Sequence, residues 1–85
     1  MYKLVFSSKF EKRLKKLTSS NKPLKFQAKK TVELIRLDID HPSLRMHKLN
    51  NQKWSVSVNK SIRMILKIDR DEIFILDIGT HEDVY

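Results

Sequence analysis

Four side chains in this sequence could together carry out one reaction. His47 and His81 can exchange protons near neutral pH, and the guanidinium of Arg63 can hold a phosphate. Tyr85 adds an aromatic ring on which an unstacked base can lie. Cleavage of RNA by its own 2′-hydroxyl requires such a set: a base for the 2′ proton, an acid for the leaving 5′ oxygen and a cation for the phosphate charge. That chemistry needs neither a metal nor a cofactor.

Each of the four side chains also has a purely structural interpretation. Arg63 stands in an otherwise apolar segment, so it must either face an incoming anion or pair with Asp77 or Glu72. His47 could cap a loop, although its neighbours Arg45 and Lys48 could also hold phosphates. At the end of the sequence, His81 could be a turn residue and Tyr85 a packing anchor.

Two helices are predicted in the first half of the chain. Ser8 and Glu11 have the spacing of a capping box, which places the N-cap of the first helix at Ser8. Pro23 suits the first turn of the second helix, which we expect to run to about Asp38. The first helix also carries exposed basic residues, among them Lys12, Lys15 and Lys16.

The second half of the chain alternates between apolar and polar residues as strands do. We predict strands over residues 54–58, 61–68 and 73–78, with Asn59-Lys60 as a two-residue turn. A further strand over residues 2–6 could pair in parallel with a later one. The order of strand, two helices and three-stranded meander predicts an α+β fold, with helices on one face of a mostly antiparallel sheet.

The charge of the chain is strongly positive and unevenly distributed. The net charge is +8 over 85 residues, and residues 1–53 hold 14 Lys and Arg against four Asp and Glu. A basic half of this kind attracts polyanions such as nucleic acid, the ribosome or an acidic partner protein. Because the sequence has no Cys, no signal peptide and no bilayer-length apolar run, we expect one cytoplasmic domain over residues 1–85, without membrane attachment.

The layout and several segments resemble the RelE/ParE superfamily of bacterial toxins, most closely its RelE/YafQ branch. The segments are Leu-Arg-Met-His-Lys-Leu (44–49), Trp-Ser-Val-Ser-Val (54–58), Ile-Arg-Met-Ile (62–65) and Ile-Leu-Asp-Ile-Gly-Thr-His-Glu-Asp-Val-Tyr (75–85). The resemblance covers essentially the whole chain and implies a RelE-like fold. It also implies the toxin of a type II toxin–antitoxin system, a ribosome-dependent endoribonuclease that cuts mRNA in the ribosomal A site and inhibits translation.

The resemblance also implies roles and partners. Arg63 would support the scissile phosphate, and His81 and His47 would share the roles of acid and base. Tyr85 would lie near the nucleotide, with Arg45 and Lys48 as supporting phosphate contacts. The basic helices would face ribosomal RNA, and a cognate antitoxin would neutralise the toxin, the complex of the two binding operator DNA. The YafQ branch tends to carry a further Arg just before its Gly-Thr-His, where this chain has Asp77 or Ile78, so a second cation would come from Arg45 or Lys48.

Two other functions remain open at this point. A ParE-like inhibitor of DNA gyrase would have the same fold without a nuclease site. A catalytically degenerate toxin would only bind its antitoxin and repress its operon. Two histidines acting as acid and base predict a cleavage rate that is bell-shaped in pH, because histidine in general titrates near neutral pH.

Overall fold

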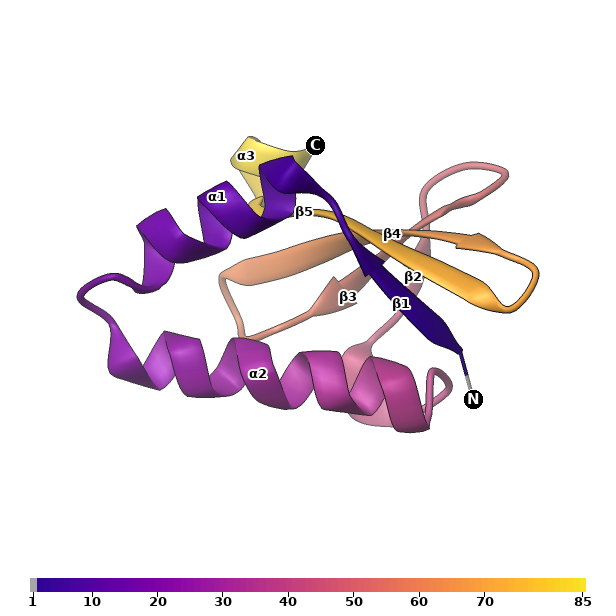
Figure 1. Cartoon of the computed structure of the whole chain (residues 1–85), viewed down its shortest axis with the longest axis horizontal. Helices are drawn as coiled ribbons and strands as arrows, with labels where there is room; N and C mark the ends of the chain where they lie inside the picture. The colour runs from indigo at the N-terminus through magenta and orange to yellow at the C-terminus, as the bar shows by residue number, and fades with distance from the viewer. Residues whose placement is uncertain (1) are drawn as a thin grey trace.

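The computed structural model describes residues 2–85, in which a helical hairpin packs on a five-stranded sheet (Figure 1). The first half contains β1 (Lys3–Phe6), α1 (Ser8–Thr18), α2 (Lys22–Leu37) and a short 3₁₀ helix, η1 (Pro42–Leu44). The second half contains β2 (His47–Lys48), β3 (Lys53–Ser57), β4 (Ile62–Asp69), β5 (Glu72–Thr80) and a one-turn helix, α3 (His81–Val84). Within residues 2–85, no helix has the length and apolar character needed to cross a membrane.

The sheet has the strand order β1-β5-β4-β3-β2, which confirms the predicted α+β class. β1 pairs in parallel with β5 across the helical hairpin, and the remaining pairs are antiparallel. The meander has one strand more than predicted, because the two residues of β2 pair with β3. A two-residue strand is too short to give a periodic signal in the sequence, so the pattern could not reveal it.

The helices α1 and α2 cover one face of the sheet. The opposite face is the open face. Strand residues alternate between the two faces. Val56, Met64, Leu66, Ile75 and Ile78 are fully buried on the covered face, in one cluster with residues of both helices: Phe10, Leu24, Ala28 and Ile35. Direct cross-strand partners point to the same side, so Ser55, Arg63 and Ile65 lie on the open face.

A β-bulge interrupts β5 next to this core. Ile65 pairs with Asp77 while the next residue, Leu66, pairs with Ile75, so Leu76 has no partner in β4. The extra residue lets Ile75 and Ile78 both join the core and places Asp77 opposite Ile65, on the open face.

The start of α1 differs from the prediction by one residue. Ser7, and not Ser8, is the N-cap: its Oγ accepts a hydrogen bond of 3.0 Å from the backbone N–H of Phe10. The hydroxyl of Ser7 also donates to the carbonyl oxygen of Leu76 at 2.7 Å, which joins the helix start to β5. Two serines stand side by side here, and the contact with β5 favours the first.

We expect Ser7→Ala to lower the free energy of unfolding by about 1 kcal/mol, because it removes the cap from α1. Ser8→Ala is the matched control and is expected to change stability by less than about 0.5 kcal/mol, because Ser8 is an exposed residue of the first turn. Urea unfolding followed by circular dichroism measures both. A larger loss with Ser8→Ala than with Ser7→Ala would contradict the observed cap.

The loop between β3 and β4 also differs from the prediction. Four residues, 58–61, link the strands in place of the predicted two-residue turn Asn59-Lys60. The side-chain oxygen of Asn59 accepts from the backbone N–H groups of Ser61 and Ile62, each at 2.8 Å. An asparagine that bonds to the backbone beside it supplies turn geometry without glycine, so these four residues can reverse the chain.

Candidate active site

Arg63 lies on the open face of β4, where neutral oxygens hold it in place. Its Nε donates to Oγ of the fully buried Ser55, and its Nη2 donates to the carbonyl oxygen of Arg45 at 3.0 Å. The alternative in which Arg63 pairs with Asp77 or Glu72 is therefore wrong. Within residues 2–85 no carboxylate forms an ion pair with Arg63, so its charge is available to an anion that reaches the open face.

His47 belongs to the same face as Arg63. In β2 it pairs directly with Ser55, the residue that holds the guanidinium, and its side chain is exposed. It lies in a strand and does not cap a loop; His41 does so, with Nδ1 accepting from the N–H of Ser43 at 3.1 Å. Ser55 thus connects His47 and Arg63, and the alternation of residues 54–58 is the sequence signal that could have found it.

The other basic residues around His47 lie elsewhere. Lys48 follows His47 along the strand and so points to the opposite side, where its Nζ is 5.8 Å from the ring of Trp54. Arg45 has a left-handed backbone conformation (φ 45°), and its backbone carbonyl oxygen accepts the hydrogen bond from Arg63. Neither the side chain of Lys48 nor that of Arg45 has a contact with Arg63 among the described hydrogen bonds.

His81 and Tyr85 are brought together by α3. Their rings meet edge to face, with centroids 4.2 Å apart, and both side chains are exposed. A capping box fixes the start of α3: Thr80 Oγ1 accepts from the N–H of Asp83 at 3.2 Å, and Asp83 Oδ2 accepts from the N–H of Thr80 at 3.1 Å. The two predicted residues therefore share one small, capped helical turn.

The position of Gly79 shows on which face of the sheet α3 lies. The register pairs Gly79 with Arg63, so a Cβ at position 79 would point to the open face. That Cβ would lie 2.7 Å from Cβ of Asp83, which shows that α3 lies directly over Gly79. The turn that carries His81 is thus on the same face as Arg63 and His47, at the strand position opposite Arg63.

We expect Gly79→Ala to displace α3, because two carbon atoms cannot approach to 2.7 Å. The measurement is an NMR spectrum of the labelled protein: shifts should change in residues 79–85 and the contacts between α3 and β5 should be lost. Unchanged signals from β4 would show that the fold is retained. Unaltered contacts between α3 and β5 in Gly79→Ala would contradict this position of α3.

The carboxyl group of Asp83 titrates with a lowered pKa. The backbone N–H of Thr80, then its hydroxyl, and more weakly the positive charges of Arg13 and Lys16, hold the pKa of Asp83 below its ordinary value of 3.8. These contacts favour the charged form in the folded turn. The stabilisation of α3 by this carboxylate is therefore complete above the ordinary pKa, and it is lost as the pH falls through the lowered one.

We consequently expect the signals of residues 80–85 to be constant from neutral pH to about pH 5 and to change towards those of a mobile segment in stronger acid. A pH titration followed by NMR measures this, with core amides as the internal reference for global unfolding. In Asp83→Ala the change should be absent. A wild-type α3 that keeps its order while Asp83 becomes protonated would contradict this role of the carboxylate.

The basic residues predicted on α1 lie outside this group. Lys12 and Lys16 line a hollow on the outer side of α1 together with Lys9 and Arg13, whereas Lys15 lines the groove between α1 and α2. All three predicted lysines are exposed. Within residues 2–85, no group of His, Asp and Glu side chains is arranged to hold a metal ion.

The comparisons with known proteins define the class of fold. No family model and no curated protein sequence matches the chain. The backbone, however, has the fold of the RelE-superfamily toxins over its whole length.

Three solved structures illustrate this similarity of fold. In the DinJ–YafQ complex of Escherichia coli, the matching chain has a TM-score of 0.84 and 17% identity, covering 100% of this chain and 99% of that one. A copper-bound mutant toxin from Helicobacter pylori has a TM-score of 0.77 and 18% identity, with 100% of both chains covered. A chain of the YoeB–YefM complex of Staphylococcus aureus has a TM-score of 0.75 and 17% identity, covering 95% of this chain and 98% of that one.

Proposed function

We propose that this protein is the toxin of a type II toxin–antitoxin system and cleaves mRNA on the ribosome. The observation that carries the proposal is the strand register of the open face. Arg63 is held by Ser55, and Ser55 pairs with His47. Arg63 also lies opposite Gly79, and the helix α3, which lies over Gly79, carries His81. A guanidinium that has no carboxylate partner within residues 2–85, two histidines and an aromatic ring form the set of groups that 2′-hydroxyl attack requires. The fold shared with the YafQ and YoeB toxins supports the same assignment.

The proposed reaction is a transfer at phosphorus within the RNA. One histidine takes the 2′ proton, the 2′ oxygen bonds to phosphorus, and the bond to the 5′ oxygen breaks. The other histidine gives a proton to that oxygen, which leaves a cyclic phosphate and a 5′-hydroxyl. Arg63 stabilises the negative charge that builds up on the phosphate oxygens, and Tyr85 offers its half-exposed ring to the base. Neither a metal nor a cofactor takes part in these steps.

The basic surface supplies the affinity for ribosomal RNA in this proposal. The exposed Lys12, Lys15 and Lys16 of α1, within a segment that carries most of the positive charge, attract phosphates without reading sequence. Arg45 and Lys48 remain proposed phosphate contacts, Lys48 from the opposite side of β2 to His47. Because the proposed substrate is mRNA on the ribosome, the proposed location of the protein is the cytoplasm.

A cognate antitoxin is the proposed protein partner. The groove between α1 and α2 has an apolar floor that includes Phe10, Leu14 and Ala28, and a rim that includes Lys15 and Lys29. An amphipathic segment of an antitoxin with acidic residues beside its apolar stripe fits this surface. The DinJ–YafQ and YoeB–YefM structures are toxin–antitoxin complexes, which supports such a partner. Operator DNA is bound only through that complex.

The test is primer extension on a reporter mRNA in a cell-free translation reaction, with and without ribosomes. We expect cuts that require ribosomes and that disappear with His81→Ala. Cuts on naked RNA would replace the proposal with a ribosome-independent nuclease. No cuts, together with DNA damage signalling in cells, would favour gyrase inhibition. No cuts and no effect on growth would favour a degenerate toxin.

A further inference from the structure

Asp77 is a buried acid that the proposed reaction does not use. Its exposed fraction is 6%, and a buried carboxylate is costly unless it is paired and hydrogen-bonded. Its Oδ1 accepts from the N–H of Ile78 at 2.8 Å, and its Oδ2 lies 3.3 Å from Nη1 of Arg13 and 3.4 Å from Nζ of Lys9. Both oxygens are thus occupied, one by β5 itself and the other by α1.

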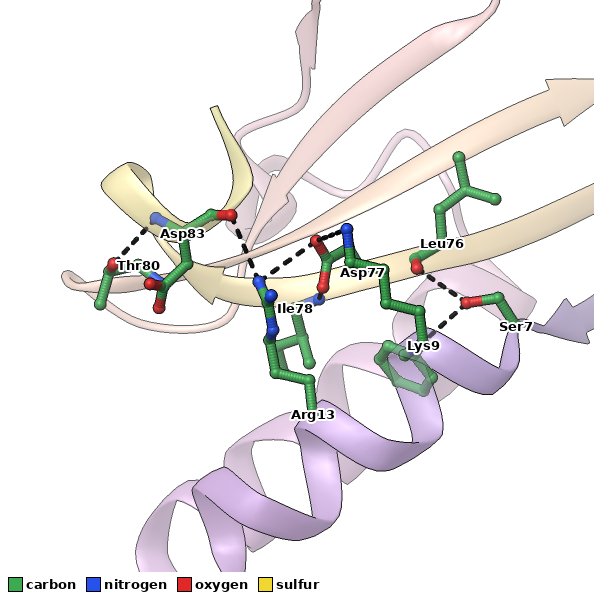
Figure 2. A network of polar contacts seen from close by, with 9 residues as sticks. Ser7, Lys9, Arg13, Leu76, Asp77, Ile78, Thr80 and Asp83 are labelled. Atoms are coloured by element: carbon green, nitrogen blue, oxygen red, sulfur yellow. Dashed lines mark hydrogen bonds and ion pairs between the residues drawn. The ribbon is translucent and has the colours of Figure 1, made fainter.

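The two cations that meet Asp77 are not equivalent. Lys9 and Arg13 are one turn apart on the same face of α1, but the side chain of Lys9 is 67% exposed and that of Arg13 only 31%. The Nη1 atom of Arg13 that meets Asp77 also donates to the carbonyl oxygen of Asp83 at 3.2 Å. Figure 2 shows the guanidinium between β5 and α3, touching both. No described contact joins Lys9 to α3.

The helix α3 needs such support from outside. A helix of one turn is not stable by itself, and its last carbonyl groups have no partner within the helix. The capping box of Thr80 and Asp83 fixes the start of the turn. Arg13 supports the other side of the turn. Its guanidinium donates to Asp77, which holds it in place, and also donates to the carbonyl oxygen of Asp83, near the end of α3.

We infer that Arg13 is a positioning residue, whose guanidinium joins the buried Asp77 to α3 and so holds His81 and Tyr85 over the open face. Asp77 restricts the guanidinium to one place, and the bulge at Leu76 turns Asp77 to the side on which α3 lies. The helix α1 therefore contributes to the site without touching the substrate. The catalytic part of this inference rests on the proposed function, whereas the structural part does not.

The structural part is tested on the full-length protein labelled with nitrogen-15. The heteronuclear NOE of residues 80–85 is compared in wild type, Arg13→Ala and Lys9→Ala. Lys9→Ala is the matched control. It removes one positive charge from the same face of α1, and it breaks the second ion pair of Asp77 while leaving that with Arg13. We expect values for residues 80–85 close to those of β5 in wild type and Lys9→Ala, and values of a mobile segment in Arg13→Ala. If Arg13→Ala does not fold, Arg13→Gln, which keeps most of the side-chain stem, takes its place with the same expectation.

The catalytic part is tested by single-turnover cleavage of ribosome-bound mRNA at increasing toxin concentration. We expect Arg13→Ala to lower the maximal rate by up to about 10²-fold, because a small misplacement of a catalytic group has effects of this size. The half-saturating concentration should change much less, because Arg13 acts on α3 and not on binding. In the His81→Ala background, Arg13→Ala should slow cleavage far less than it slows the wild type, since the arginine acts through α3 and only the placement of Tyr85 is then left to lose.

The outcomes separate the two proposals. A rigid α3 in Arg13→Ala overturns the inference, whether or not the protein cuts RNA. A mobile α3 in Arg13→Ala combined with an inactive wild type overturns the proposed function and retains Arg13 as the residue that positions α3. A change in the half-saturating concentration alone would make Arg13 an RNA contact and overturn its positioning role.

Discussion

His81→Ala is expected to slow ribosome-dependent mRNA cleavage by about 10²–10⁴-fold, the usual contribution of a general acid or base. His81 is exposed on α3, and α3 lies over Gly79, the strand partner of Arg63. The side chain makes an edge-to-face contact with Tyr85, so its loss should leave the core unaffected. Single-turnover cleavage, with unfolding midpoints as a check on the fold, measures this effect.

The chain offers a matched control for this experiment in its third histidine. His41 caps η1 through Nδ1, and His41→Asn retains an acceptor for the N–H of Ser43. We expect this variant to cleave at the wild-type rate. If His81→Ala also cleaved at the wild-type rate, the assignment of α3 to the active site would be wrong. His47→Ala in the same assay separates the roles, because the loss of one proton-transfer group removes one limb of the bell-shaped pH profile.

Arg63→Ala is expected to lower the same rate by about 10²–10³-fold, the effect typical of removing one group that stabilises transition-state charge. The structure explains why the charge is in place before the substrate arrives. Ser55 and the carbonyl of Arg45 take up Nε and Nη2, and the remaining N–H groups are left for the phosphate. Arg63→Lys should recover only part of the rate, because a single ammonium cannot bond to Ser55 and Arg45 and also present a fork to the phosphate.

Lys67→Ala provides the control for charge. Lys67 is four residues further along β4 and on the same face, so the variant removes one positive charge from the same strand without touching Ser55. We expect it to reduce the rate far less than Arg63→Ala. Equal losses in the two variants would mean that overall charge, and not the placed guanidinium, determines the rate. Ser55→Ala should lie between them, because it releases one of the two contacts that hold Arg63.

Local sequence pattern was sufficient to predict the longer helices and strands. In α2, the apolar residues Leu24, Ala28 and Ile35 recur at helical spacing, and all three lie in the core. Alternation over residues 54–58 and the apolar run 73–78 located strands of the sheet, although β5 extends further at both ends. The parallel pairing of the first strand was also predicted, because a strand followed by two helices returns to the sheet by a crossover.

The sequence by itself therefore determined the two long helices, the first strand, the three longer strands of the meander and the choice of proposed site residues, because these depend on residue type and on spacing of a few positions. The tertiary structure alone decided how the site is held. Arg13 meets Asp77 across 64 positions of sequence, and the glycine before Thr80 matters because α3 lies on it and not because of its own backbone angles. Ser55 likewise gains its role only when β3 and β4 pair. Contacts of this kind leave no periodic trace, since burial and register arise only when distant segments pack together.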